Sequence, residues 1–405
     1  MAYQEVTKTS YGSRLGSSLK GILTGLVLFV AATCLLWWNE GRAVKTAKML
    51  KSAESECVDV ADVSTVDPAL NGKLIHACAV AKTDEVLSDP AFGVSANAIR
   101  IVRDVEYYQW VETSTSVTKD KVGGGQETTT TYDYHKEWVG SPVNSADFKD
   151  PDYQGSNYVR TTIEDNTVSA EKVTFGGYVL PKGMANAIPA NTPVEVPQQA
   201  DTTDVVVSGN VVYYGNPQDP QVGDVRVTFT KADGGEASIL AKVNDNTFEP
   251  YSKNGKNLQV LRMVKISMES MFETEKAANK AILWILRILG IMLVIAALRM
   301  MFSILVTILK VLPPLAAVGE LGVNLVTAVV GFVWSLLIIL IAWVVYRPVL
   351  AIVLALVIAA LVYFLIKKSK DAAAAAPAAA PAAAPAAPAA PAAPAAPEAP
   401  KSDAE

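Results

Sequence analysis

Four long apolar runs and one polar region between the first and second of them set the organisation of this chain. About 20 apolar residues are needed to cross the roughly 30 Å of hydrocarbon in a bilayer. Runs of this kind occupy residues 19–38, 281–309, 321–346 and 349–366. One predicted span therefore precedes a large polar segment and three follow it. The pattern predicts an integral multi-pass membrane protein.

Between the first two spans the pattern changes to short alternating runs bounded by Gly, Pro, Asn and Asp, which is typical of β-strands. The clearest is residues 224–230 (DVRVTFT), where Val and Phe alternate with Arg and Thr. Two aromatic runs, 106–112 and 132–138, flank a Gly-rich stretch and predict a hairpin with a long mobile tip. If the region forms two lobes, the proline-rich residues 184–200 are the expected boundary.

The predicted fold class is an α+β membrane protein with four transmembrane helices and a large β-rich extracytoplasmic domain between the first and second. The expected parts follow in chain order: a flexible cytoplasmic leader at 1–18, a span at 19–38, the β-rich domain at 39–280, spans at 281–309, 321–346 and 349–366, and a disordered Ala/Pro-rich cytoplasmic tail at 367–405.

The first span is expected to remain as an anchor, because no small-residue cleavage site follows it. Charged and apolar residues alternate at helical spacing from residue 40 to 52, so this helix should continue beyond the membrane. The second predicted span carries Arg287 and Arg299. Both are expected to snorkel to opposite interfaces, with a pore, a lipid headgroup site or pairing between helices as the alternatives.

The composition excludes some classes of function but does not identify the function. The chain is 51% hydrophobic with a net charge of −5, which excludes a nucleic-acid binder. Its two histidines, His76 and His135, belong to no metal-ligand spacing, and no catalytic motif is present, so neither a cofactor nor enzymatic activity is expected. Cys57 and Cys78 form a disulfide only if the domain faces an oxidising compartment.

Charge alone decides the orientation poorly, since basic residues flank the first span on both sides. Lys310 and the basic residues of the tail favour cytoplasmic termini, whereas Arg347 opposes them. We expect both termini in the cytoplasm and the β-rich domain on the other side of the membrane.

Several short motifs resemble the transmembrane protein 43 (LUMA) family. They begin with residues 39–43 (NEGRA) directly after the first span and include residues 108–112 (YQWVE), the Gly-Asp pair at 223–224 and residues 346–348 (YRP). The resemblance covers roughly residues 15–365 in the same order and spacing. The tail lies outside it and is more typical of a bacterial member.

The resemblance implies cytosolic termini, a lumenal domain and a protein of the endoplasmic reticulum and inner nuclear envelope in animals, with links to emerin and lamins. In a bacterium it implies the inner membrane and a periplasmic domain. The leading hypothesis is a non-enzymatic scaffold that oligomerises and organises other membrane proteins in the bilayer; an envelope-stress sensor and a channel or transport accessory are the alternatives. The candidate interaction residues are Asn39, Glu40, Gly41, Arg42, Tyr108, Gln109, Trp110, Glu112, Trp138, Gly223, Asp224, Arg226, Arg287, Tyr346, Arg347 and Pro348.

Overall fold

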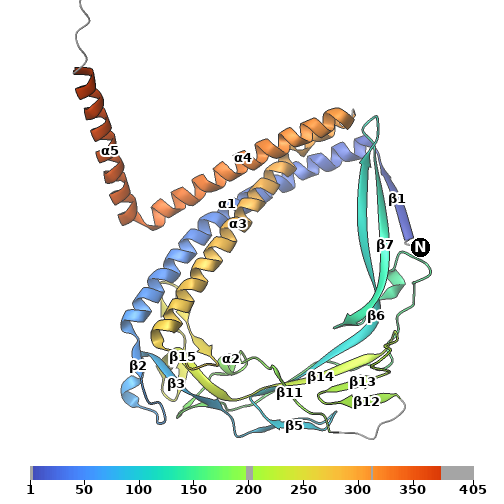
Figure 1. The fold of residues 1–405 in the computed structure, drawn as a ribbon, viewed down its shortest axis with the longest axis vertical. Helices are drawn as coiled ribbons and strands as arrows, with labels where there is room; N and C mark the ends of the chain where they lie inside the picture. The colour runs from blue at the N-terminus through green and yellow to red at the C-terminus, as the bar shows by residue number, and fades with distance from the viewer. Residues whose placement is uncertain (1–2, 198–203, 312, 375–405) are drawn as a thin grey trace, which may run out of the picture. The chain divides into compact units, whose positions relative to one another are not determined.

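The computed structural model describes residues 3–197, 204–311 and 313–374. The chain divides into two compact units, residues 1–347 and 348–405. The first contains the β-rich domain and three long helices (Figure 1), and the second contains α5 (Pro348–Ala374). The predicted tail beyond residue 374 lies outside the described residues.

The three helices of the first unit are α1 (Tyr11–Glu56), α3 (Met268–Leu309) and α4 (Pro313–Tyr346). Within the described residues, Tyr11–Glu56, Met268–Leu309 and Val318–Tyr346 are long and apolar enough to cross a membrane. Helix α5 is also rich in Leu, Val, Ile and Ala, so one apolar helix precedes the large β-rich domain and three follow it. The predicted α+β class is therefore confirmed.

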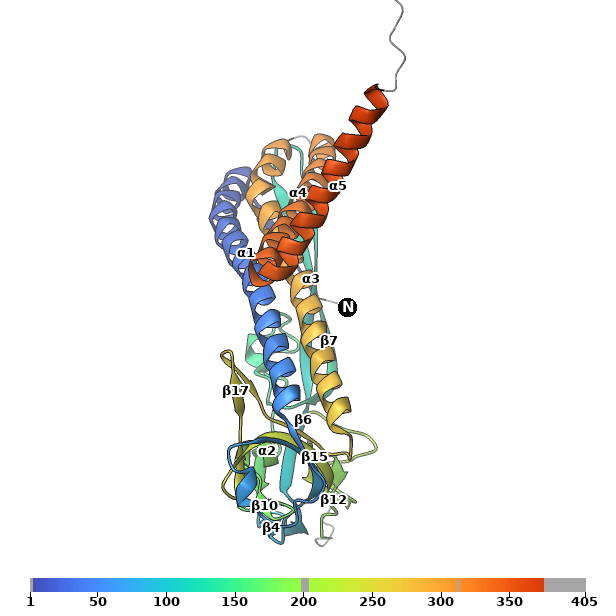
Figure 2. The same cartoon turned by 90° about the vertical axis from the view of Figure 1, so that its left-hand side faces the viewer.

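Helices α1 and α3 lie side by side along almost their whole length (Figure 2). Small residues permit the close approach. A Cβ atom at Gly290 would lie 2.4 Å from a methyl carbon of Leu36, and one at Gly25 would lie 2.8 Å from the carbonyl oxygen of Ala297. Because such small residues let helix backbones pack tightly, they stabilise helix pairs in membranes, where the hydrophobic effect contributes little.

Strands of the domain form two large sheets. The first follows the order β1-β7-β6-β14-β13-β12, with β8 pairing β6 and β11 pairing β14. Its strands are β1 (Tyr3–Thr9), β6 (Arg100–Asp120), β7 (Gln126–Val139), β8 (Asn166–Ser169), β11 (Thr192–Pro193), β12 (Val205–Ser208), β13 (Val211–Tyr214) and β14 (Val225–Ala232).

The second sheet follows the order β19-β15-β16-β10-β9-β3-β2, and β15 also pairs β3, so the pairings close into a circuit. Its strands are β2 (Val58–Val60), β3 (Leu74–Lys82), β9 (Thr174–Phe175), β10 (Tyr178–Val179), β15 (Gly235–Asn244), β16 (Thr247–Glu249) and β19 (Val260–Arg262). Smaller elements are β4 (Val86–Asp89), β5 (Val94–Asn97), β17 (Tyr251–Lys253), β18 (Lys256–Leu258), α2 (Lys182–Ala185), η1 (Pro68–Leu70) and η2 (Ser145–Asp147).

One apolar core joins the two sheets. It contains Ile101 and Phe229 from the first sheet and Ile75 and Phe175 from the second, all at most 1% exposed. The alternation predicted for residues 224–230 is present in β14, whose inward side chains are buried. Because this cluster includes residues of both sheets, the described part of the domain does not divide into two separately packed lobes.

Two segments that the sequence predicted to be mobile form ordered contacts in the first sheet. Residues 3–9, expected as a flexible leader, form β1 and pair with β7 over seven positions. The tip of the β6–β7 hairpin contacts α1, since the Arg14 guanidinium lies 2.8 Å from the Asp120 carboxylate. An unpaired strand edge exposes backbone donors and acceptors, and β1 supplies partners for those of β7.

Candidate functional site: a polar junction between the apolar helices

A single buried carboxylate connects three helices at the end of the apolar stretch of α1. Glu40 has no exposed surface. Arg287 of α3 donates a hydrogen bond from Nε to Glu40 Oε1 at 2.6 Å, and a guanidinium nitrogen of Arg347, directly after α4, lies 3.5 Å from Oε2. A buried carboxylate is costly unless it is paired, and here two arginines compensate its charge.

Asn39 and Arg42 extend this junction toward the domain. Asn39 Nδ2 donates to the carbonyl oxygen of Leu283 at 3.0 Å, while its Oδ1 accepts from Arg42 Nε at 3.3 Å. Arg42 also donates to Asn279 Oδ1 at 3.1 Å, and Asn279 Nδ2 donates to the carbonyl oxygen of Ala43 at 3.0 Å. These side chains fix the register of α1 against α3.

Aromatic rings enclose the ion pairs. A Cβ atom at Gly41 would lie only 2.6 Å from Tyr346 Cζ, so only glycine leaves room for this ring. Tyr346 also faces Trp37, with 6.0 Å between ring centroids. The Arg287 guanidinium lies 4.9 Å from the ring centroid of Trp284, a cation–π contact.

The structure thus brings together most of the membrane-proximal candidate residues. Residues 39–42, Arg287, Tyr346 and Arg347 meet at one place, and Pro348 begins α5. Arg287 does not snorkel as expected, because its partner is buried. Arg299 is exposed and lines a separate cavity of about 230 Å³ between α3 and α4. Asn279 carries no sequence signal, since nothing local marks a single asparagine in a helix.

The candidate residues in the middle of β6 contact β7 and the long loop that follows β7. Gln109 is 1% exposed and donates to the carbonyl oxygen of Tyr158 at 3.2 Å. The backbone amide of Trp110 donates to Asn157 Oδ1 at 2.8 Å. Glu112 accepts from the hydroxyl of Tyr134 at 2.5 Å. Burial and this hydrogen bond raise the pKa of Tyr134 to about 12.

Tyr108, Trp138 and Arg226 pack together across the neighbouring strands β6, β7 and β14. The Arg226 guanidinium lies 4.5 Å from the ring centroid of Trp138, whose ring is 5.2 Å from that of Tyr108. Asp224 is 2% exposed and accepts from Arg160 at 2.9 Å. Gly223 has a φ of +95°, which favours glycine. These contacts satisfy one another and favour a role in the sheet over ligand binding.

His76 carries polar contacts that the sequence did not reveal. It is 3% exposed; its Nδ1 lies 2.7 Å from Asp59 Oδ1 and its Nε2 lies 3.0 Å from the carbonyl oxygen of Ile266. Cys57 and Cys78 are free thiols, and burial raises the pKa of Cys57 to about 12. No group of three or more possible metal ligands occurs within the described residues.

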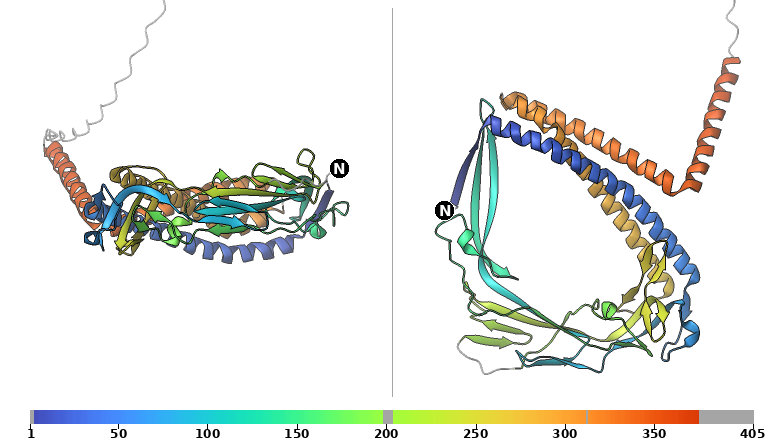
Figure 3. Two further views of the ribbon diagram at one scale, coloured as in Figure 1. Left: turned by 90° about the horizontal axis from the view of Figure 1, so that it is seen from below. Right: turned by 180° about the vertical axis from the view of Figure 1, so that it is seen from behind.

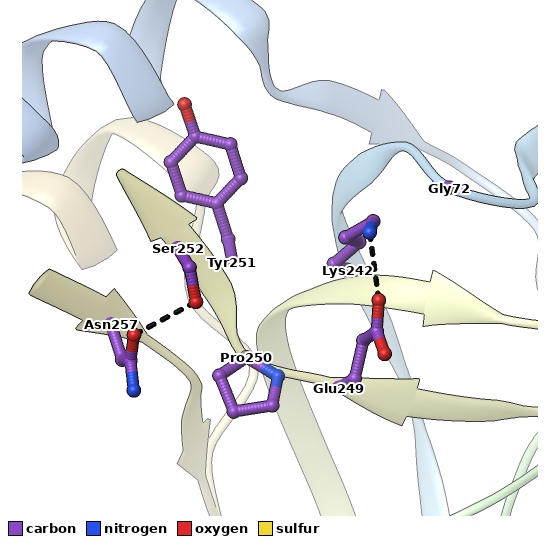
Figure 4. A pocket seen from close by; sticks show the side chains of 7 residues that line it. All are labelled: Gly72, Lys242, Glu249, Pro250, Tyr251, Ser252 and Asn257. Carbon is purple, nitrogen blue, oxygen red and sulfur yellow. Dashed lines mark hydrogen bonds and ion pairs between the residues drawn. The ribbon is translucent and has the colours of Figure 1, made fainter. Parts of the chain in front are cut away.

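A second cavity of about 420 Å³ opens beside β17 and β18 (Figure 4). Lys242 Nζ lies 2.7 Å from a Glu249 carboxylate oxygen, and the Ser252 hydroxyl donates to Asn257 Oδ1 at 2.8 Å. These four groups are satisfied by one another. Its lining consists of Gly72, Lys242, Glu249, Pro250, Tyr251, Ser252 and Asn257.

Comparison of the sequence with known proteins places the chain in a family. Residues 107–348, which include most of the domain, α3 and α4, match the family model described as Transmembrane protein 43. The chain belongs to the transmembrane protein 43 family. Transmembrane protein 43 of Rattus norvegicus is 33% identical over 350 residues, covering 83% of this chain and 86% of the relative.

Two further relatives show the breadth of the transmembrane protein 43 family. The Homo sapiens protein is 31% identical over 357 residues, covering 84% of this chain and 88% of its own length. The Drosophila melanogaster homologue is 27% identical over 336 residues, covering 81% and 89%. No solved structure matches the chain. The family resemblance inferred from the motifs is therefore confirmed.

Proposed function

We propose that this protein is a non-enzymatic membrane scaffold in which the β-rich domain and the apolar helices move as one unit and organise neighbouring membrane proteins. The observation that carries this proposal is the Glu40 junction, where one buried carboxylate is shared by α1, α3 and the residue after α4. A domain merely displayed on an anchor would need no such junction.

A second contact transmits the position of the helices to the domain. Met49 and Ala53 of α1 and Phe272 of α3 are at most 2% exposed and pack in one cluster with Leu74 of β3 and Leu240 of β15. Between Glu40 and this cluster α1 is unbroken. A displacement of the helices therefore reaches the second sheet through rigid structure.

The outer faces of the helices provide surface for partners within the bilayer. Leu321, Leu325 and Val329 of α4 are each more than half exposed and lie on one helical face. We propose that this face contacts lipid and a second copy of the chain. We propose that the domain lies on the extracytoplasmic side, which is the periplasm in a bacterial cell and the lumen in an animal cell.

Crosslinking of the full-length chain in its native membrane tests the scaffold. A photoreactive residue at Leu325 should capture a second copy or another membrane protein, whereas the same residue at the buried Ala297 should not. If the Leu325 probe captures lipid alone, and the purified chain in nanodiscs has the mass of a monomer, the scaffold proposal fails.

A stress sensor is a second candidate, favoured by the position of His76. This ring joins Asp59, just after α1, to Ile266, just before α3. Replacing His76 with glutamine should then change an envelope-stress response, and exchange at the exposed His135 should not. The channel alternative has less support, because the charge of Arg287 is compensated by Glu40.

A further inference from the structure

A polar cavity lies between α3 and α4 at the end of the helices that is remote from the second sheet. The chain turns back from α3 into α4 at this end, as the right-hand view of Figure 3 shows. Its lining consists of Arg299, Ser303, Val306, Thr307, Lys310, Glu320, Val323 and Asn324. Six of these eight residues are polar or charged, although both helices are apolar enough to cross a membrane.

The lining residues form one face on each helix. Positions 299, 303, 306, 307 and 310 of α3 and its end recur at the spacing of a single helical face, and so do positions 320, 323 and 324 of α4. The Thr307 hydroxyl also lies 2.7 Å from the Ser18 hydroxyl of α1. Apolar side chains would pack these helices equally well, so the polar face requires a different explanation.

Arg299 lies within the hydrocarbon part of α3. From Arg287 at the polar junction to Lys310 after the helix is 23 residues, or about 35 Å at 1.5 Å per residue. This is close to the roughly 30 Å of hydrocarbon in a bilayer. Arg299 is 11 residues, or about 16 Å, from Lys310. Phe302 and Leu305 beside it are 43% and 49% exposed, as expected of a lipid-facing surface. An arginine at this depth needs a counter-charge.

The lining does not neutralise itself. In the part of the helices that the structure describes, Arg299 forms no ion pair. Lys310 lies 3.5 Å from Asp120, but Arg14 shares that carboxylate at 2.8 Å. Glu320 is the single acidic residue of the lining. Two cations against one carboxylate give the cavity a net charge of +1, which favours an anion.

We propose that this cavity binds the phosphate group of an anionic phospholipid. The Arg299 guanidinium then donates to the phosphate oxygens from within the bilayer, and Lys310 stabilises the same group from its edge. Arginine binds phosphate through two parallel hydrogen bonds, and basic pockets between transmembrane helices bind anionic headgroups. The side-chain amide of Asn324 also lines the cavity and can donate.

Size and surroundings favour a lipid over a soluble ligand. The volume of about 230 Å³ is below the roughly 300–1,000 Å³ of pockets for drug-sized molecules, so the cavity suits a headgroup. Next to Glu320, Leu321 and Leu325 of α4 are 73% and 66% exposed. Acyl chains cover such side chains, whereas a soluble phosphate compound leaves them uncovered. This develops the headgroup alternative that the sequence left open for Arg299.

Native mass spectrometry of the full-length chain, released from nanodiscs of equal phosphatidylglycerol and phosphatidylcholine, tests the site. The wild type should retain phosphatidylglycerol selectively. Arg299→Gln should reduce this retention about tenfold or more, because hydrogen bonds between charged groups are lost. The matched control is Lys280→Gln, which removes an exposed lysine elsewhere on α3 and should retain lipid as the wild type does.

Glu320→Gln supplies a readout that a folding defect cannot imitate. Removing this carboxylate raises the net charge of the lining from +1 to +2. The variant should therefore retain more phosphatidylglycerol than the wild type, whereas a misfolded chain would retain less. We expect opposite changes from Glu320→Gln and Arg299→Gln.

Four results would overturn the proposal. The wild type could retain both lipids equally, or Arg299→Gln could retain phosphatidylglycerol unchanged. Displacement of the lipid by added inorganic phosphate would assign the cavity to a soluble anion. Loss of a second copy of the chain from Arg299→Gln, with lipid retention unchanged, would assign Arg299 to a carboxylate of that copy. The scaffold function is independent of these outcomes, because it rests on the Glu40 junction.

Discussion

Replacing Glu40 with glutamine removes the charge of the junction while preserving the shape of the side chain. Arg287 and Arg347 then lose their shared carboxylate, yet their side chains remain only 15% and 25% exposed. Helix α1 loses its ion pair with α3, and the two arginine side chains stay close together without a carboxylate between them. The variant should therefore weaken the packing of all three helices.

The size of the effect follows from burial. Removing one partner of a buried ion pair typically costs about 3–5 kcal/mol, because the other charge stays buried without compensation. Arg287 retains some solvent and its contact with Trp284, so we expect the lower end, about 3 kcal/mol. At 1.36 kcal/mol per tenfold change, this is a roughly 150-fold decrease in the folding equilibrium constant.

Reversible unfolding of the full chain in micelles, followed by tryptophan fluorescence, measures this loss. The matched control is Glu54→Gln on the same helix, whose partner Lys276 is 43% exposed. Exposed pairs contribute at most about 1 kcal/mol, so this control should change stability little. A double variant with Glu40→Leu and Arg287→Leu should be less destabilised than Glu40→Leu alone, since only Arg347, and no longer two arginines, is left without the carboxylate.

Two results would refute this reasoning. One is a Glu40→Gln variant as stable as the Glu54→Gln control. The other is a Leu–Leu double variant whose loss equals the sum of the two single losses, because independent sites add and coupled sites do not. Either would mean that the three side chains are neighbours without a shared energetic role.

Three further predictions test individual contacts. Gly41→Ala should destabilise the helices because its Cβ would collide with the Tyr346 ring. A Cβ at Gly16 meets nothing within 4 Å, so Gly16→Ala should not destabilise them. Unfolding in micelles compares the stability of the two variants. Cys57 should react slowly with iodoacetamide at neutral pH and faster as pH approaches its pKa of about 12, and fast alkylation at pH 7 would contradict this. Because the pKa of Tyr134 is raised to about 12, its contribution to stability is fully present below pH 10 and is lost as pH rises toward 12. The absorbance of tyrosinate, compared between the wild type and Tyr134→Phe, should show this late titration. Ionisation of Tyr134 near pH 10 would exclude it.

The sequence patterns predicted which segments form helices and strands better than they predicted which residues contact one another. Apolar runs alone were sufficient for the helices, and the alternation in β14 correctly indicated which side chains are buried. The motif at residues 39–42 also drew attention to Glu40. Its partner Arg287 is 247 positions away, however, and no local pattern distinguishes a paired arginine from a snorkelling one.

The amino-terminal strand was missed for a related reason. Residues 3–9 (YQEVTKT) are short and polar, so their local preference for a strand is weak. They become a strand because the edge of β7 supplies partners from residue 126 onward. His76 was similarly inconspicuous, since Asp59 and Ile266 reach it only through the pairing of β2 with β3 and the return of the chain before α3.

Hydrogen–deuterium exchange of the full chain in nanodiscs tests most directly whether the junction couples the helices to the domain. Wild type and Glu40→Gln are compared at α3 and at β3 (Leu74–Lys82), which lie on either side of the cluster around Leu74. The account predicts faster exchange in both elements of the variant. Faster exchange in α3 with β3 unchanged would contradict it, because the domain would then be independent of the helices.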